Sequence, residues 1–225
     1  MTAPVVEAHD VRYRYDARST FELHIPELQV HAGQTLACIG PSGCGKTTLV
    51  NIISGVVRAR SGRVVLCGRE LTAMSDAARR EHRLKCVGMV FQEFELLTYL
   101  TALENILLPF HIGKGMRLDE QARRRASELA ETVGITHLLR RRPRRLSQGE
   151  RQRVAVCRAL VTSPRIIIAD EPTGSLDPVN ARSVIDLLIE AAELAKAALL
   201  VVTHDHALLD RFDRIIDLGS SGGAQ

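Results

Sequence analysis

Hydrophobic and polar residues follow one another in two distinct ways in the first part of this chain. In residues 5–15 and 21–30 they alternate, which predicts short strands separated by turns. A continuous apolar run at 35–39 is followed by a glycine-rich turn and then by residues 46–57, whose apolar positions have the period of a helix. The order strand, glycine-rich loop, helix is therefore predicted here.

The middle of the chain changes character. Residues 62–71 predict a hairpin, and from about residue 92 to 155 the pattern is helical. Gly134 is suited to ending one of these helices. Side chains suited to helix N-caps precede the predicted helices: they are Ser75 before 76–84, Thr101 with Glu104 before 102–110, Asp119 before 120–133, and Ser147 with Glu150 before the next helix.

Two apolar runs and one helix complete the pattern. The runs lie at 165–170 and 198–204, and between them Asp177, followed by Pro178, marks a helix start. Strands that are apolar throughout and alternate with helices are typical of a parallel sheet buried on both faces. The sequence therefore predicts an α/β fold in which the helical segment 92–155 is an insertion.

Composition narrows the class of protein. The chain has 225 residues, 45% of them hydrophobic and 25% charged, which suits one compact domain or two small lobes. A net charge of +4 is too small to indicate nucleic-acid binding, and we expect no such partner. Five cysteines without a C-x-x-C pair predict neither a disulfide framework nor a zinc site. Neither a signal peptide nor an apolar run of about 20 residues is visible, so we expect a chain of a reducing compartment that reaches a membrane only through a partner.

The strongest chemical motif is GPSGCGKT, a full match to G-x-x-x-x-G-K-[ST]. Glycines let consecutive N–H groups converge on phosphate oxygens, and the helix that follows adds its positive end. Lys46 is suited to reach the β- and γ-phosphates, and Thr47 to bring a hydroxyl to Mg²⁺. Since the motif lies between a predicted strand and a helix, we favour a nucleotide site over a chance turn. The candidate binding residues are Gly40, Pro41, Ser42, Gly43, Cys44, Gly45, Lys46, Thr47 and Thr48.

Polar side chains follow other predicted strands. Asp170 and Glu171 end one apolar run, at the carboxyl edge of the sheet where ligands bind in such folds. One carboxylate can hold Mg²⁺ while the next polarises a water; without the upstream phosphate loop, a plain turn would be the better interpretation. His204 and Gln92 also follow apolar runs. Taken alone, His204 is better explained as a cap or surface residue, and Gln92 indicates nothing.

The sequence LSQGE at 146–150 permits two roles. Ser147 and Glu150 have the spacing of a capping box, and a helix N-terminus with small residues also suits a phosphate. The residues alone leave both roles open.

In this order, GPSGCGKTT, Gln92, LSQGE, IIIADEPTGSLD and VVTHD resemble the nucleotide-binding subunit of ABC transporters, over about residues 5–218. LTALENILLP and ADEPTGSLD are most similar to the lipoprotein-release and macrolide-export (LolD-like and MacB-like) ATPases. The resemblance implies a P-loop NTPase (RecA-like) core, an antiparallel β subdomain and an inserted α-helical subdomain. It implies one ABC ATP-binding domain over 1–225, with the β subdomain and core in 1–91 and 156–225, and the helical subdomain in 92–155.

The same resemblance implies that LSQGE is a signature motif used in trans. In this family two subunits pair head to tail, so that Ser147 and the Gly149 amide contact the γ-phosphate bound by the partner's P-loop, with Glu150 in the same motif. A capped helix start directs N–H groups at an anion, so both roles of the motif are compatible. Two positions depart from the common LSGGQ form. Glu150 replaces a glutamine, a variant that occurs in the lipoprotein-release group, and Gln148 places a side chain where close backbone approach is expected.

Further roles come from the same resemblance. Asp170 holds Mg²⁺ through water, Glu171 is the general base, and His204 contacts the γ-phosphate. Gln92 senses Mg²⁺ and the γ-phosphate and couples them to the membrane partner. In the remaining positions, Asp177 lies in the loop that connects the two sites, and Tyr15 aligns with the aromatic residue that stacks on adenine, with Tyr13 as an alternative.

The ligands and partners implied are ATP, Mg²⁺, a head-to-tail homodimer and an integral membrane permease, on the cytoplasmic face of the inner membrane. Two functions stay open: powering a permease of the export or lipoprotein-extraction type, or mechanical signalling to periplasmic enzymes, as in division-associated relatives. A soluble ABC protein of ribosomes or DNA is disfavoured, because such proteins usually carry two cassettes or a long coiled coil. The basic run 140–145 is either a solvated face or a contact with anionic lipid headgroups.

Overall fold

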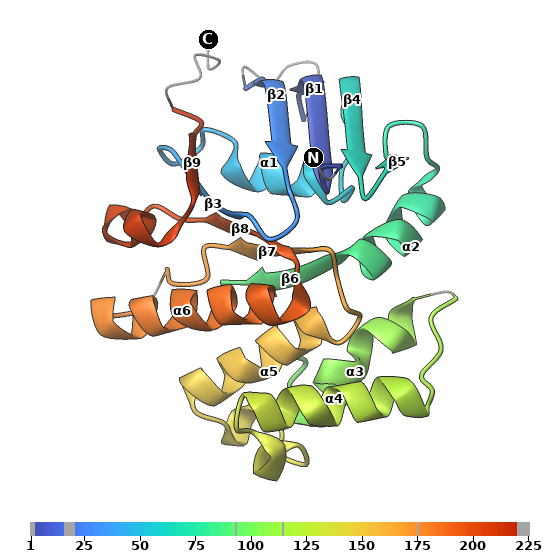
Figure 1. The fold of residues 1–225 in the computed structure, drawn as a ribbon, viewed down its shortest axis with the longest axis vertical. Helices are drawn as coiled ribbons and strands as arrows, with labels where there is room; N and C mark the ends of the chain where they lie inside the picture. Colours follow the sequence, from blue (N-terminus) through green and yellow to red (C-terminus); the bar gives the residue numbers. More distant parts are fainter. Residues whose placement is uncertain (1–2, 16–20, 93, 114, 175, 220–225) are drawn as a thin grey trace.

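The computed structural model describes residues 3–15, 21–92, 94–113, 115–174 and 176–219, which form two sheets with helices around them (Figure 1). The antiparallel sheet has the strand order β2–β1–β4–β5, with bounds Leu23–Val30, Val6–Tyr13, Ser61–Leu66 and Arg69–Glu70. The parallel sheet has the order β6–β7–β8–β3–β9, with bounds Val87–Phe91, Ile166–Asp170, Ala198–Val202, Thr35–Ile39 and Arg214–Asp217. The predicted α/β arrangement and the predicted hairpin, β4–β5, are confirmed.

The parallel sheet is buried on both faces because its central strands are apolar throughout. In β8, Ala198, Leu200 and Val202 belong to the core beneath the antiparallel sheet. Leu199 and Val201 belong to the core on the other side. All five residues have no exposed surface, so successive side chains of one strand anchor two separate cores.

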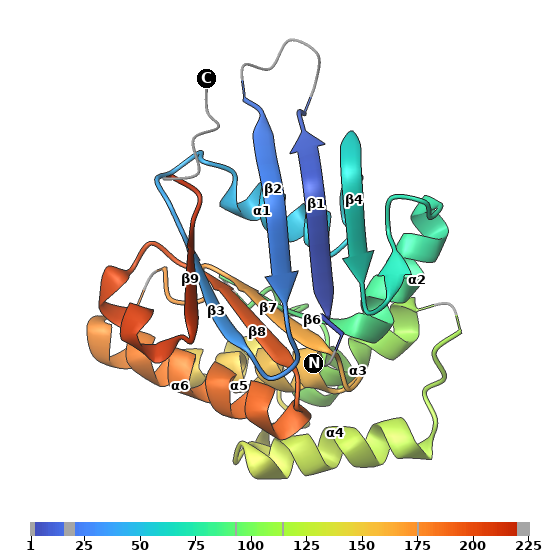
Figure 2. The same ribbon diagram turned by 45° about the horizontal axis from the view of Figure 1, so that its top comes forward.

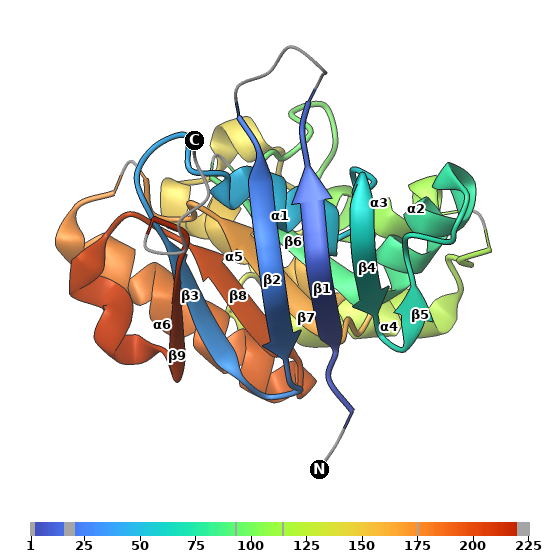
Figure 3. The same ribbon diagram turned by 90° about the horizontal axis from the view of Figure 1, so that it is seen from above.

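Helices fill both cores. α1 (Lys46–Ile53) lies between the two sheets (Figure 3), where its apolar side chains are buried. The opposite core is built from α3 (Ala102–Ile112), α4 (Glu120–Thr132), α5 (Gln148–Leu160) and α6 (Pro178–Ala195). α4 lies farthest from the antiparallel sheet (Figure 2). α5 continues past residue 155, across the boundary expected for the helical subdomain. Among the described helices, none combines the length and apolar character needed to cross a lipid bilayer.

The predicted capping residues bind the backbone where their helices begin. Both capping boxes form, at Thr101–Glu104 and at Ser147–Glu150. The single caps are Ser75 at α2 (Asp76–Cys86), Asp119 at α4 and Asp177 at α6. Gly134, with φ of 73°, follows the end of α4 as predicted. α1 differs from these helices because it begins at Gly45, which makes no side-chain cap.

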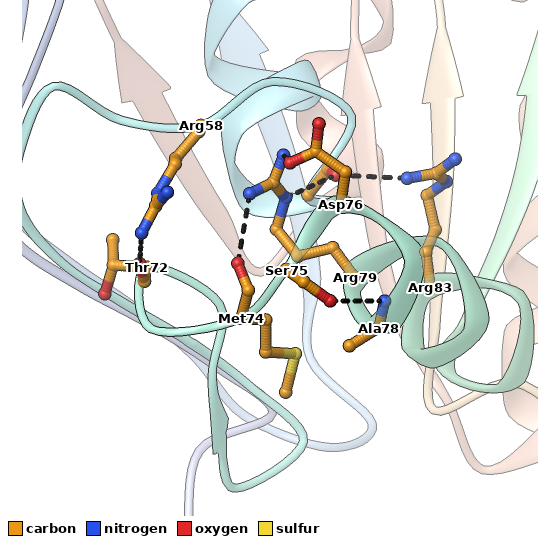
Figure 4. A network of polar contacts seen from close by, with 9 residues as sticks. Arg58, Thr72, Met74, Ser75, Asp76, Ala78, Arg79 and Arg83 are labelled. Atoms are coloured by element: carbon orange, nitrogen blue, oxygen red, sulfur yellow. Dashed lines mark hydrogen bonds and ion pairs between the residues drawn. The ribbon is translucent and has the colours of Figure 1, made fainter.

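Arginines of α2 fix the chain just after α1 (Figure 4). Arg79 is 5% exposed and donates to the Gly55 carbonyl (3.4 Å), the Met74 carbonyl (3.4 Å) and Asp76 Oδ1 (2.9 Å). Arg83 Nη1 donates to the same Gly55 carbonyl at 3.1 Å. Gly55 follows the C-terminal end of α1, the helix that starts in the P-loop. The two guanidinium groups therefore lie at the end of α1 that carries the negative pole of the helix dipole.

We expect Arg79→Met to lower the free energy of unfolding by about 1–3 kcal/mol, because the carbonyls lose a buried donor while the aliphatic stem is kept. Arg58→Met is the matched control: Arg58 is exposed and donates to the Thr72 carbonyl at 2.7 Å (Figure 4), and its loss should change stability by no more than about 0.5 kcal/mol. Urea denaturation measures both. Equal losses in the two variants would contradict a special role for the Arg79 network.

Candidate active site

The loop between β3 and α1 has the conformation expected of a phosphate loop. Gly40, Gly43 and Gly45 have φ angles of 148°, 81° and 105°, which L side chains rarely adopt. A Cβ on Gly45 would lie 2.9 Å from Cζ of Phe21, so this position is also closed sterically. α1 begins with neither a side-chain cap nor an acidic residue in its first turn. Its first N–H groups are therefore free to bind an anion.

Lys46 folds back over this loop. Its Nζ donates to the carbonyls of Gly40 (2.8 Å) and Pro41 (3.2 Å), and the residue is 8% exposed. Both acceptors are neutral, so phosphate oxygens would be the stronger acceptors for the same ammonium. The loop amides and Lys46 together fit a polyphosphate.

Asp170 and Thr47 fit the oxygen ligands that a divalent cation prefers. Oδ1 of Asp170, at the end of β7, is buried without a hydrogen-bond partner in the described chain. Burial raises the pKa of Asp170, and a hydrogen bond with Thr47 opposes that shift. The described residues hold no cluster of three or more His, Cys, Asp or Glu side chains suited to a metal. Mg²⁺ at this place would therefore take its other ligands from water and phosphate oxygens, as it usually does.

Glu171 and His204 meet because β7 and β8 are neighbouring strands. The Glu171 amide donates to the Val202 carbonyl at 3.0 Å, and Oε2 of Glu171 lies 2.6 Å from His204 Nδ1. Glu171 has φ of 49°, a left-handed conformation that costs on the order of 1 kcal/mol for a residue with a side chain. The backbone of Glu171 is thus fixed by a hydrogen bond. Because its side chain is 25% exposed, the carboxylate is accessible to water.

Gln92 and the loop before α6 lie on the other side of β7. Gln92 directly follows β6, and a Cβ on Gly174 would lie 2.7 Å from its Nε2. The Gln92 amide therefore lies against the backbone of the loop that leads to Asp177, where α6 begins. The carboxyl edge of the parallel sheet thus carries Gln92, Asp170, Glu171, His204 and the P-loop, the positions that the sequence placed after its strands.

The structure separates the two candidate tyrosines. Tyr15 is 60% exposed, and its hydroxyl lies 2.8 Å from Oγ1 of Thr48 in α1. Tyr13 is half-buried against the core between the sheets, with its ring 5.2 Å from that of Tyr15 in an edge-on contact. Tyr15 is therefore the tyrosine with an exposed ring beside the P-loop helix.

The start of α5 forms a surface of its own. Oγ of Ser147 accepts from the Glu150 amide (3.3 Å), and Oε2 of Glu150 accepts from the Ser147 amide (2.6 Å), which holds the pKa of Glu150 below its usual range. A Cβ on Gly149 would meet nothing within 4 Å. The adjoining hollow of about 970 Å³ includes Ser147, Gln148 and Gly149, and its other described lining residues come from α4, α5, α6 and their flanks rather than from the P-loop.

Two buried polar residues hold the segment after Gln92, and the sequence analysis missed both. Arg158 of α5 is 9% exposed and donates to the carbonyls of Phe94 (2.7 Å) and Glu95 (2.8 Å). Asn105 of α3 has no exposed surface and bonds to the backbone of residues 97, 100 and 101. Each is a polar side chain among the apolar positions of its helix, which is the signal that would have identified it.

Comparison with known proteins identifies the family. The ABC transporter family matches residues 23–174. Two relatives, the lipoprotein-releasing system ATP-binding proteins LolD of Pseudomonas fluorescens (strain Pf-5) and Pseudomonas syringae pv. tomato (strain DC3000), are each 43% identical over 192 residues, which is 85% of this chain and 84% of theirs. These findings confirm the resemblance stated from the motifs.

Solved structures agree. The dimeric ATP-binding cassette MJ0796, in a post-hydrolysis state with ADP and phosphate, is 31% identical with a TM-score of 0.78, over 95% of this chain and 94% of that one. CbiO1 from Clostridium perfringens, part of the transporter complex CbiONQ, is 26% identical with a TM-score of 0.79, over 91% of this chain and 80% of that one. The predicted P-loop NTPase fold is thereby confirmed. This chain belongs to the ABC transporter family, as an ATP-binding subunit that hydrolyses ATP.

Proposed function

We propose that this ATPase powers a separate integral membrane permease of the export or lipoprotein-extraction type, from the cytoplasmic face of the inner membrane. The observation that carries the proposal is the 43% identity, over 85% of the chain, to ATP-binding proteins of lipoprotein-releasing systems. Glu150 in the signature motif and the LTALENILLP segment support the same group.

The test begins with capture of the permease. A tagged Glu171→Gln chain is incubated with ATP and detergent-solubilised host membranes, and the co-purifying membrane protein is identified. The wild-type pair is then reconstituted in liposomes that contain a fluorescent triacylated peptide. ATP-dependent release of that peptide to a soluble acceptor is expected. A pair that hydrolyses ATP while the lipopeptide stays in the bilayer would contradict extraction.

In this proposal the carboxyl edge of the parallel sheet carries out hydrolysis. The P-loop amides and Lys46 bind the β- and γ-phosphates, and Thr47 and Asp170 hold Mg²⁺, Asp170 through water. Mg²⁺, when bound, neutralises charge on the phosphate oxygens. Because phosphoryl transfer passes through a loose transition state, the protein acts chiefly by positioning and electrostatics.

Glu171 accepts the proton of the attacking water, and His204 contacts the γ-phosphate. The 2.6 Å contact with His204 uses one oxygen of the Glu171 carboxylate, which leaves the other for water. The backbone hydrogen bond to Val202 fixes the position from which the Glu171 side chain extends. Gln92 reports the occupancy of the site to the permease, and Tyr15 stacks on adenine, since its ring is exposed beside α1.

Two chains pair head to tail in this proposal. Ser147 and Gly149 of one chain bind the γ-phosphate on the partner, and Asp177 lies in the loop that connects the two sites. The open space at Gly149, the separate surface at the start of α5 and the dimeric state of the similar cassette MJ0796 support the pairing. We also propose the division into a β subdomain with core, residues 1–91 and 156–225, and a helical subdomain, residues 92–155, with α5 crossing the second boundary.

Glu171→Gln should lower the rate of ATP hydrolysis by about 10²–10⁴-fold, because it removes the general base. ATP binding should be kept, and a dimer should accumulate with ATP in light-scattering measurements. The wild-type rate per subunit should rise with protein concentration. The same substitution at exposed Glu193 of α6 is the control, and a Glu171→Gln protein with full activity would refute the assignment.

Alkylation of Cys44 should block ATP binding, since the thiol lies within the phosphate loop, 2.6 Å from where a Cβ on Gly40 would be. MgATP should protect it. Cys44 is half-exposed and therefore accessible to the reagent. Cys38 and Cys157 are buried, and burial raises the pKa of each thiol to about 12. The Cys44→Ser variant controls for reaction at other cysteines and should keep ATP binding after treatment. Unchanged ATP binding after confirmed modification of Cys44 would contradict its place in the site.

Arg158 should act as a positioning residue in the same reaction. Arg158→Lys keeps the charge but not the fork that reaches two carbonyls, so kcat should fall about tenfold with little change in KM for ATP. Arg151→Lys, on the exposed face of α5, should change neither. A loss of thermal stability with unaltered kcat would show that Arg158 only supports the fold.

A further inference from the structure

A hollow of about 570 Å³ is lined by two segments that are far apart in the sequence. One segment contributes Thr98 and Tyr99, from the loop between β6 and α3. The other contributes arginines 140, 141, 142, 144 and 145, which precede the start of α5. All five arginines are exposed, and Tyr99 is 67% exposed. We call this the arginine pocket.

The arginine pocket gathers positive charge that the protein does not neutralise. In the part of the chain that the structure describes, none of its five arginines forms an ion pair within 4.0 Å, whereas Arg14, Arg63 and Arg79 each pair with a carboxylate. Glu104 and Glu150 interact electrostatically with Arg142 and Arg141, respectively. Each carboxylate, however, accepts a hydrogen bond from the N-cap amide of its own capping box. An anion placed here would relieve the mutual repulsion of the arginines.

The backbone that carries the arginines is fixed. The carbonyls of Leu139 and Arg141 accept from the amides of Leu103 and Ala102, in the first turn of α3. Leu138, Pro143 and Leu146 are buried at both ends and in the middle of the segment. The arginine side chains therefore project from a rigid base, which reduces the entropy lost when a ligand binds.

The position of the arginine pocket favours a protein partner as its occupant. Thr98 and Tyr99 lie in the segment that follows Gln92. Asn105 bonds the backbone on both sides of them, at residues 97 and 100, and Arg158 bonds the backbone just before, at residues 94 and 95. A ligand on Tyr99 thus touches the segment that leads back to the catalytic edge. Guanidinium forks match carboxylates in two-point hydrogen bonds, and the exposed tyrosine ring offers a surface for a neighbouring side chain.

We propose that the arginine pocket binds an acidic segment, rich in glutamate or aspartate, of the membrane partner. The proposal rests on the proposed function, since it gives the chemistry by which the permease is recognised. Charge complementarity and a tyrosine anchor set the specificity, and the contact lies on the segment through which Gln92 is linked to α3 and α5.

The test uses the full purified chain and fluorescein-labelled hexaglutamate, measured by fluorescence anisotropy at physiological salt, with hexaglutamine as the neutral control. Arg142→Glu/Arg144→Glu should raise the Kd for hexaglutamate at least tenfold. Arg123→Glu/Arg124→Glu, which reverses two exposed charges on α4, is the charge-matched control and should change it less than twofold. Equal losses in both variants would overturn the proposal, because binding would then follow net charge.

Two further measurements decide where and what the chain binds. The chain has no tryptophan, so Tyr99→Trp gives a single reporter in the arginine pocket, and its emission should change saturably with hexaglutamate. Leu194→Trp, an exposed site on α6, should not respond. Binding to phosphatidylglycerol vesicles that depends on Arg142 and Arg144, without binding of hexaglutamate, would overturn the acidic partner in favour of a lipid surface. Co-purification of a membrane permease with the Glu171→Gln chain is measured alongside: failure to capture any permease would refute the proposed function, whereas failure of the peptide alone refutes only this proposal.

Discussion

Burial of the parallel sheet on both faces is the constraint on which the candidate site depends. The side chains of β7 and β8 are buried on both faces of the sheet. A charged group on either face would lose its hydration without gaining a partner, which costs free energy. Polar side chains are therefore confined to the ends of these strands. Parallel strands place their carboxyl ends along one edge, which is why Gln92, the Asp170–Glu171 pair and His204 gather beside the P-loop although long stretches of sequence separate these three positions.

The backbone next to this edge is held in conformations that few side chains adopt freely. Glu171, Phe94 and Glu95 have φ angles of 49°, 60° and 40°. In each case a hydrogen bond from another element fixes the strained residue: the Val202 carbonyl accepts from Glu171, and Arg158 donates to Phe94 and Glu95. Such positions persist only where surrounding structure determines them, so packing around β8 and α5 is coupled to the backbone that carries the candidate catalytic residue Glu171 and the segment after Gln92.

Much of this arrangement was predictable because its signals are local. Caps such as Ser75, Asp119 and Ser147 mark helix starts within three or four residues, and the alternation of apolar strands with helices fixes the parallel sheet. What escaped prediction depends on contacts between distant segments. The choice between Tyr13 and Tyr15 needs the position of α1, the approach of Gln92 to Gly174 needs two neighbouring strands, and the role of Arg158 needs the loop that it holds. Periodicity records which side of an element is buried, but not what it is buried against.

For the proposed head-to-tail dimer, the geometry of α5 gives a physical basis for communication between the two sites. Its N-terminal end carries the proposed signature motif LSQGE, and its last turn carries Arg158, which holds the segment after Gln92. At roughly 1.5 Å per residue, Ser147 and Arg158 lie about 16 Å apart on one helix, and the buried face between them packs in the core of the helical side. A helix so packed moves as a unit. In the proposed head-to-tail dimer, a displacement of Ser147 on binding of the partner's nucleotide would be carried along α5 to the carbonyls of Phe94 and Glu95, in the segment that leads to the arginine pocket.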